Sequence, residues 1–328
     1  MDLSISCAFA TSPTTPDDIA LAEHLGYDRA WCYDSPAIYP DVWMTLALAA
    51  DRTDRIGLGP AVLVPNLRHP MTNAAAIATL VGLAPGRVAV AIGSGFTGRF
   101  TLGQRPLRWA DVQAYVEVVR ALLRGEAVEW EGALIQMLHP ESHAPARPID
   151  VPIFIGAEGP KGTAVAHAVG DGIFSAVFPN ADGRGQPQAL LRFGTVLDPG
   201  ESHTDVRVIE AAGAAVAVIY HGMYERDHAS VDSLPGGAVW HEAIDATPER
   251  ERHLAIHEGH LIGPTERDRA ALDAGGAELI PTFTLSGTAA EVRARVEEFA
   301  AQGVTEIAYQ PAGPDIPREL EAFIAAVR

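Results

Sequence analysis

The chain has 328 residues, and its 42 acidic side chains against 24 lysines and arginines give a formal net charge of −18 at pH 7. Such an acidic chain is not expected to bind nucleic acid, because phosphate backbones require a basic face. The length fits one large barrel or two average domains, and a hydrophobic content of 48% predicts a substantial core.

The two cysteines, Cys7 and Cys32, both lie in apolar runs. This favours buried thiols in a reducing compartment over a disulfide framework or a metal site. The first residues show no basic leader, and no apolar run is expected to be long enough to span a bilayer. We therefore expect a soluble, cytoplasmic protein with no membrane partner.

Strand and helix patterns alternate through the first part of the chain. Apolar runs typical of buried strands occur at 3–9, 29–34, 56–64 and 88–92, and helical patterns occur at 16–25, 42–51, 71–83 and 109–123. Nearly continuous apolar strands that alternate with helices are typical of a parallel sheet covered on both faces.

A glycine-rich turn follows the next strand, at 152–155, and leads into a short helix at 163–169 and a further strand at 172–176. Pro160 presets the first helical turn, and the free N–H groups of that turn form an anion site. The only lysine of the chain, Lys161, lies in this turn. A lysine there opposes the helix dipole unless an anion lies nearby, so the alternatives are a phosphate contact and a solvated surface lysine.

The alternation resumes near the end of the chain. Strands are predicted at 214–220 and 305–310 and helices at 289–301 and 317–327, with a capping box formed by Thr288 and Glu291. Eight strands over this length favour an α/β fold of the (β/α)8 TIM-barrel type, because the G-x-G-x-x-G turn of an open dinucleotide-binding sheet does not follow the first strand. We expect a single domain over 1–328, with insertions at about 178–210 and 222–285, after strands six and seven, covering the barrel mouth.

Five segments together resemble a known family. They are RAWCYDS (29–35), GLGPAVLVPNLRHP (57–70), GRVAVAIGSG (86–95), VPIFIGAEGPKGTAVAHAVGDG (151–172) and GTAAEVRARVEEFAAQGVTEIAYQP (287–311). The chain resembles the bacterial-luciferase-like superfamily of flavin- and deazaflavin-dependent oxidoreductases, in the branch similar to methylenetetrahydromethanopterin reductase. The resemblance implies hydride exchange between coenzyme F420, an 8-hydroxy-5-deazaflavin, and a small organic substrate.

The resemblance also implies which residues hold the cofactor. The phosphate would bind the turn made of Gly156, Ala157, Glu158, Gly159, Pro160 and Lys161. A non-prolyl cis peptide between Ala61 and Val62 would lie behind the ring, with Asp34, Ser94 and Gly95 at the ring's polar edge.

Two positions depart from the patterns of relatives. Ser35 follows Asp34 where deazaflavin-dependent relatives commonly have a histidine, and Phe96 stands where sugar- and alcohol-oxidising relatives have a catalytic glutamate. Oxidation of sugar phosphates or simple alcohols by that mechanism is therefore not expected. The Glu-His-His string of many flavin-dependent members is also missing, which favours F420 over FMN.

Three histidines gather in one short segment, where His253, His257 and His260 flank Glu258 and Gly259. On a helix they would share a face, but Gly259 weakens the helix, and the H-E-x-x-H order of zinc hydrolases is not present. A metal site, which we do not favour, a solvated cluster and a substrate pocket remain open. In a pocket, His257 or His260 would donate a proton and Glu258 would tune the imidazole, making these three the candidate catalytic residues.

Alternatives to F420-dependent hydride transfer are an FMN-dependent monooxygenase that uses oxygen and a barrel that binds cofactor without catalysis. The resemblance and the alanine-rich helices after strands two and three favour a homodimer. Trp31, Trp43 and Trp109 are expected in the core, and Arg68 and His69 could reach the cofactor from the loop after strand three.

Overall fold

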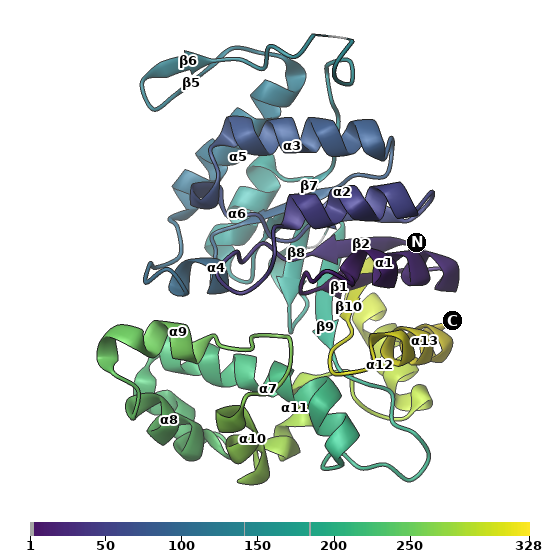
Figure 1. Cartoon of the computed structure of the whole chain (residues 1–328), viewed down its shortest axis with the longest axis vertical. Coiled ribbons are helices and arrows are strands. Elements are labelled where there is room, and N and C mark those ends of the chain that lie inside the picture. Colours follow the sequence, from purple (N-terminus) through teal and green to yellow (C-terminus); the bar gives the residue numbers. More distant parts are fainter. Residues whose placement is uncertain (1–2, 141, 184) are drawn as a thin grey trace.

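A parallel barrel forms the centre of the molecule in a computed structural model that describes residues 3–140, 142–183 and 185–328. Within these residues, eight strands form one sheet in the order β3-β2-β1-β10-β9-β8-β7-β4, and the paired strands run parallel (Figure 1). The strands are β1 (Ser4–Phe9), β2 (Arg29–Cys32), β3 (Gly57–Pro60), β4 (Val90–Gly93), β7 (Ile153–Gly156), β8 (Gly172–Ala176), β9 (Gln188–Phe193) and β10 (Glu306–Gln310).

The barrel closes where β3 meets β4. Isolated parallel bridges join Leu58 to Val88 and Leu63 to Ile92 across this seam. The backbones approach so closely that a Cβ on Gly59 would lie 1.9 Å from the carbonyl oxygen of Ala89. Glycine at position 59 is therefore required for closure, and the predicted (β/α)8 barrel is confirmed.

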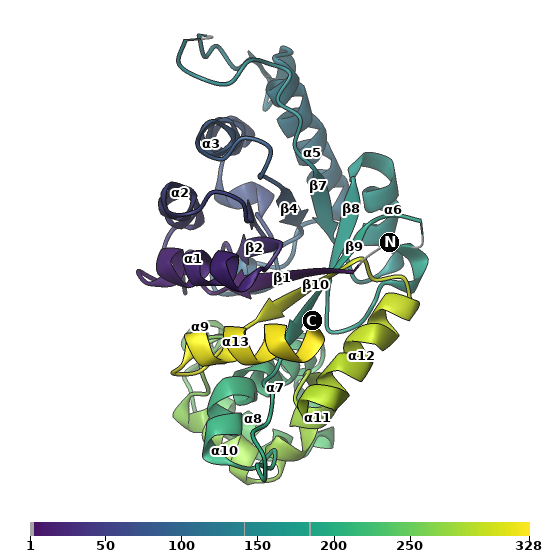
Figure 2. The ribbon, with the colours of Figure 1, turned by 90° about the vertical axis from the view of Figure 1, so that its right-hand side faces the viewer.

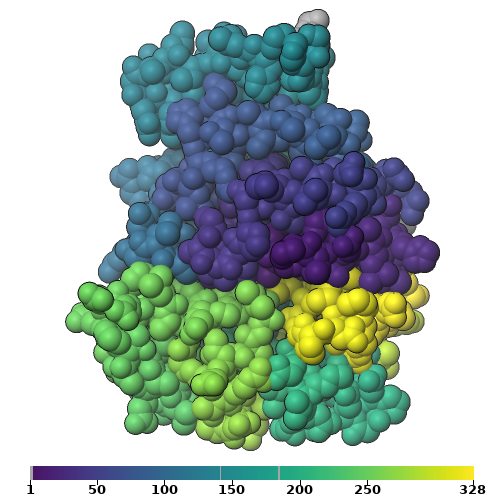
Figure 3. Space-filling view, viewed as in Figure 1, coloured from purple at the N-terminus to yellow at the C-terminus, as the bar shows by residue number. Residues whose placement is uncertain are grey.

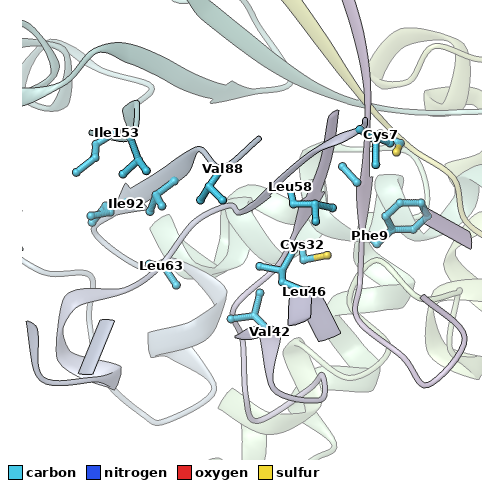
Figure 4. Packing of buried hydrophobic residues seen from close by; sticks show 14 of the residues in the cluster. Cys7, Phe9, Cys32, Val42, Leu46, Leu58, Leu63, Val88, Ile92 and Ile153 are labelled. Carbon is cyan, nitrogen blue, oxygen red and sulfur yellow. The ribbon is translucent and has the colours of Figure 1, made fainter. Parts of the chain in front are cut away.

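Helices surround the barrel (Figures 1 and 2). They are α1 (Thr15–Leu25), α2 (Val42–Arg52), α3 (Pro70–Leu83), α5 (Trp109–Arg124), α6 (Pro160–Val169), α12 (Ala289–Ala301) and α13 (Ile316–Val327). Figure 4 shows the buried layer between strands and helices, where Cys32 and Leu58 lie near Val42 and Leu46 of α2. Both cysteines are buried and unpaired, as predicted.

Two sequence-based assignments in the second half of the chain are wrong. The predicted strand at 214–220 lies inside helix α7 (Val206–Arg226), and the seventh barrel strand is β9, within the stretch 178–210 that was assigned to an insertion. The run AAGAAVAVIY is buried on most sides of α7, so it shows no amphipathic stripe to distinguish helix from strand. One long insertion therefore follows β9, and only a short loop separates β8 from β9.

The insertion has its own hydrophobic core, centred on Val216, Tyr220, Trp240, Ile244 and Ile280. Besides α7 it contains α8 (Gly237–Asp245), α9 (Arg252–Ile256), α10 (Glu266–Asp273) and α11 (Ile280–Phe283), with 3-10 turns η3 (His228–Ser233), η4 (Glu249–Glu251) and η5 (Gly276–Leu279). Figure 3 shows it, in green, packed against one end of the barrel.

Helix α7 corrects a further expectation. By length and composition alone it could cross a membrane, although the sequence was expected to contain no such run. Most of its apolar residues are buried, many of them against the insertion core, and 56% of the most apolar window is covered. That packing accounts for its composition, because a helix surrounded by protein is apolar on most sides.

Smaller elements complete the chain. They are the short helix α4 (Thr97–Phe100), the 3-10 turns η1 (Pro65–Leu67) and η2 (Ala181–Gly183), and an antiparallel hairpin of β5 (Val128–Trp130) and β6 (Ala133–Ile135). The hairpin projects beyond α3 and α5 at one end of the molecule (Figure 1).

Candidate active site

A cavity of about 1170 Å³, including its open mouth, lies where β2, β3, β4, β7 and β8 end. This is the edge at which barrel enzymes carry their functional residues. Its walls include Tyr33, Asp34, Ser35, Tyr39, Ala61, Val62, Val64, Ser94, Gly95, Phe96, Thr97, Trp109, Gly156, Glu158, Gly159, Phe174, Leu191, His260 and Leu261. Eight of the predicted cofactor-binding residues are in this set.

The glycine-rich turn forms one wall. Gly159 is the N-cap of α6 and provides no side-chain acceptor for the first-turn N–H groups, and Pro160 follows it. A Cβ on Gly159 would meet no atom within 4 Å, whereas one on Gly162 would lie 2.5 Å from the ring of Trp109. The turn thus presents bare backbone donors beside an aromatic wall, an arrangement that fits a phosphate group.

Three residues of the predicted phosphate turn do not line the cavity. Ala157 is buried behind the turn, and Pro160 and Lys161 are exposed outside the wall. Trp109, expected only in the core, is half-buried and lines the cavity. Its periodic position in α5 predicted packing correctly but could not show that its ring lies beside α6.

A cis peptide bond joins Ala61 to Val62, directly after β3, as the family resemblance implied. Val62 packs against two glycines at the ends of neighbouring strands, since a Cβ on Gly93 or Gly156 would lie 2.9 or 2.8 Å from its side chain. These residues together make the back wall of the cavity.

Asp34 is a buried carboxylate on the cavity wall. Arg68 donates from Nη1 to Asp34 Oδ2 at 2.5 Å and from Nη2 to Asp41 Oδ2 at 2.7 Å. Burial raises the pKa of Asp34, although the hydrogen bond and charge of Arg68 oppose this effect. Arg68 and His69 are not among the residues that line the cavity. Arg68 pairs with the Asp34 carboxylate, and His69 caps α3 by accepting a hydrogen bond from the Met71 N–H.

The three predicted catalytic residues are separated in the structure. His260 lines the cavity, His257 is fully buried beside it, and the Glu258 side chain is 69% exposed in a separate hollow. A different carboxylate lies near these rings: Glu225 Oε1 is 3.6 Å from His257 Nε2. The solvated-cluster interpretation is wrong for His257 and His260.

Two hydrogen bonds tie the turn that carries His260 to the barrel. Tyr39 Oη donates to the carbonyl of His260, and Gln310 Nε2 donates to the carbonyl of Leu261 at 2.6 Å. Tyr33 Oη donates in turn to Gln310 Oε1 at 2.7 Å. Sequence reasoning missed these three polar residues, which follow or end barrel strands and which no local motif marks.

The chain matches a family of known proteins. Residues 14–306 match the family model described as luciferase-like monooxygenase. The chain belongs to the luciferase-like family. Within it, the chain is an oxidoreductase of the methylenetetrahydromethanopterin reductase-like branch.

Two relatives and one solved structure illustrate the similarity of this luciferase-like protein. It is 27% identical to 5,10-methylenetetrahydromethanopterin reductase of Archaeoglobus fulgidus, over 92% of this chain and 91% of that protein. It is also 27% identical to F420-dependent glucose-6-phosphate dehydrogenase of Beutenbergia cavernae, over 92% and 88%. The structure of F420-dependent tetrahydromethanopterin reductase from Methanopyrus kandleri has the same fold, with a TM-score of 0.71 and 23% identity over 100% and 99%.

Phe96 is part of an aromatic group in this luciferase-like site. Its ring meets Phe100 edge-on at 4.9 Å between centroids and His257 at 5.9 Å. An apolar ring therefore occupies the position that the family resemblance associates with a catalytic glutamate.

Glu158 is the ionisable group of the phosphate turn. The Ala176 N–H donates to its Oε1 at 2.5 Å. The side chain is exposed to the cavity, but the surrounding protein partly shields its carboxyl group from water. This loss of hydration disfavours the charged form and raises the pKa of Glu158 to about 7. The charge of the turn therefore changes near neutral pH.

Proposed function

We propose that this luciferase-like protein exchanges hydride between coenzyme F420 and a small organic substrate. The observation that carries the proposal is the convergence of the α6 turn, Asp34 and the Ala61–Val62 bond on one cavity. Support comes also from relatives named as F420-dependent dehydrogenases and methylenetetrahydromethanopterin reductases.

The residues of the cavity have separate roles in this proposal. First-turn N–H groups of α6 hold the cofactor phosphate, and Val62 supports the ring from behind. Asp34, Ser94 and Gly95 provide hydrogen-bonding groups for the polar edge of the ring. When bound, F420 supplies the carbon that gives or receives hydride, while the protein orients the reactants and excludes water.

His260 is the predicted catalytic residue that we retain. Its Nε2 lies 3.1 Å from Thr97 Oγ1, and both residues line the cavity. Burial, with a smaller effect of His257, lowers the pKa of His260 to about 3, so its imidazole is neutral at physiological pH. We propose that it forms a hydrogen bond with a polar atom of the substrate, whereas His257 and Glu258 do not contact it.

The walls restrict the substrate class. Phe96, Trp109, Phe174, Leu191 and Leu261 make most of the remaining lining apolar. We therefore propose a small organic substrate with an apolar body and one polar group near the reacting carbon, in preference to a sugar phosphate.

A direct binding experiment tests the cofactor. Purified protein would be titrated with F420 and with FMN, each oxidised and reduced, while absorbance and fluorescence are followed. We expect F420 to bind more tightly and reduced F420 to be oxidised by an accepted substrate. Binding of FMN alone, with oxygen consumed by the reduced flavin, would establish the monooxygenase alternative named by the family model.

We also propose a cytoplasmic homodimer. Met44 and Leu48, one turn apart on α2, expose 72% and 52% of their surfaces, and Leu83 at the end of α3 exposes 50%. These helices are the alanine-rich ones for which the sequence predicted a contact between subunits. Burial of such side chains against a second copy would remove them from water.

A further inference from the structure

A cluster of three buried histidines lies between the insertion and the cofactor cavity. His221 comes from α7, and His257 and His260 come from the turn after α9. Each of the three histidines is at most 7% exposed. Each has a ring nitrogen that lies within 4.8 Å of a ring nitrogen of the other two. His221 replaces His253, which the sequence grouped with the other two.

The spacing of the rings matches a metal-binding arrangement. The centroid distances are 5.3 Å for His221–His257, 5.4 Å for His221–His260 and 5.7 Å for His257–His260. Three imidazoles bound tetrahedrally to one zinc ion would have centroids about 5.3 Å apart, given Zn–N bonds of about 2.0–2.1 Å. The Nδ1 atoms of His221 and His260 are 3.2 Å apart, near the separation expected for two such ligands.

Several ring nitrogens of the cluster are not hydrogen-bonded to other described residues. Both ring nitrogens of His257 and the Nε2 of His221 are buried and have no hydrogen-bond partner among the residues that the structure describes. The contact between the Nδ1 atoms of His260 and His221 does not satisfy these nitrogens, because it involves neither ring nitrogen of His257 and leaves the Nε2 of His221 without a partner. Buried polar atoms are normally satisfied, and a metal ion bound by one ring nitrogen of His257 would give a partner to a ring that otherwise has none.

The surroundings supply the groups that orient metal-bound histidines. Glu225 Oε1 lies 3.6 Å from His257 Nε2, and Thr97 Oγ1 lies 3.1 Å from His260 Nε2. Metal-bound imidazoles commonly form a hydrogen bond through their second nitrogen, and Thr97 is within hydrogen-bond distance, whereas the Glu225 carboxylate would have to move a few tenths of an ångström closer. His221 and Glu225 are four residues apart on α7, so they share one face of the helix.

Aromatic rings enclose the cluster. Phe100 stacks on His257 at 6.0 Å between centroids, and Trp240 lies 5.6 Å from His221. A buried pocket with imidazole nitrogens as ligands suits a borderline ion such as zinc better than magnesium or calcium, which prefer oxygen ligands.

We propose that His221, His257 and His260 bind one divalent transition-metal ion, with zinc as the representative ion. The site would join α7 to the turn that carries His260 and would fix which ring nitrogen of His260 faces the cavity. This inference goes beyond the proposed hydride transfer and does not depend on F420 binding.

The test uses untagged full-length protein, stripped with a chelator and then titrated with zinc by calorimetry. We expect one ion per chain, and cobalt in its place should give the intense visible absorption of tetrahedral nitrogen coordination. Glu225→Gln should weaken zinc binding about 10–100-fold, because it removes the orienting carboxylate. His221→Ala and His257→Gln should weaken it at least as much, and His253→Ala is the matched control that should bind normally.

Circular dichroism would establish that each variant is folded, and Glu225→Gln keeps the test valid if a ligand variant does not fold. Folded wild-type protein that binds neither zinc nor cobalt would overturn the proposal. Binding that survives in every variant would also overturn it, since the ion would then lie elsewhere. Either result leaves F420 binding as a separate question, measured on the same samples by cofactor titration.

Discussion

Glu158 is placed where its ionisation should affect cofactor binding. Its pKa of about 7 lies above the usual value of 4.5, so the neutral acid predominates at pH 6 and the carboxylate at pH 8. A carboxylate beside a bound phosphate repels it, whereas the neutral acid does not. We therefore predict that F420 affinity falls several-fold between pH 6 and pH 8.

The matched variant is Glu158→Gln, which keeps an oxygen to accept from the Ala176 N–H. Its affinity should change less over the same range, and the ratio of the two proteins' dissociation constants cancels the titration of the cofactor itself. A ratio that stays constant with pH would mean that Glu158 does not sense the phosphate.

Lys161 separates the backbone and charge contributions to the same site. Because its side chain is exposed outside the cavity wall, Lys161→Ala should weaken F420 binding by about 1 kcal/mol, at the low end for a charge-assisted contact. Fluorescence titration at low salt would measure the change. Unchanged affinity would mean that the N–H groups of α6 suffice and that Lys161 is a surface residue.

At the scale of elements, the seam between β3 and β4 depends on Gly59. Gly59→Ala would place a Cβ 1.9 Å from the Ala89 carbonyl oxygen, so the strands would have to separate. We predict a loss of about 3 kcal/mol in the free energy of unfolding, at the upper end for overpacking. Urea denaturation would measure it.

The control for this prediction is Gly222→Ala, because Gly222 lies within α7 and its added Cβ would meet no atom within 4 Å. Alanine there should be neutral or should stabilise by up to about 1 kcal/mol. Equal stability of the Gly59→Ala protein and wild type would show that the seam adapts more easily than its geometry indicates.

At the scale of the whole molecule, the proposed dimer has a direct test. The double change Met44→Glu and Leu48→Glu would place two charges on the exposed face of α2, and burying them against a second copy would be unfavourable. Light scattering after size exclusion should show a dimer for wild type and a monomer for this variant. Val206→Glu, which changes a 75% exposed residue of the insertion, should remain dimeric.

The barrel was largely predictable because its first four strands are apolar on both faces and alternate with helices. The cofactor turn was also readable, since glycine and proline act locally. By contrast, Gln188 and Arg192 leave β9 with only a short apolar run between them, while α7 is buried on so many sides that it shows no stripe. The partner of His260 lies 39 residues away, and no local pattern reports such a contact.

The two bonds that hold the His260–Leu261 turn have a consequence for how ligands enter and leave. Tyr39, in the loop after β2, and Gln310, at the end of β10, both hold this turn, and these two strands flank β1 in the sheet. The His260–Leu261 turn, which lines the cavity, is thus anchored to the barrel and does not need to close over a bound ligand. Ligands should therefore enter and leave without a movement of this turn, so the preformed shape of the cavity would select among them.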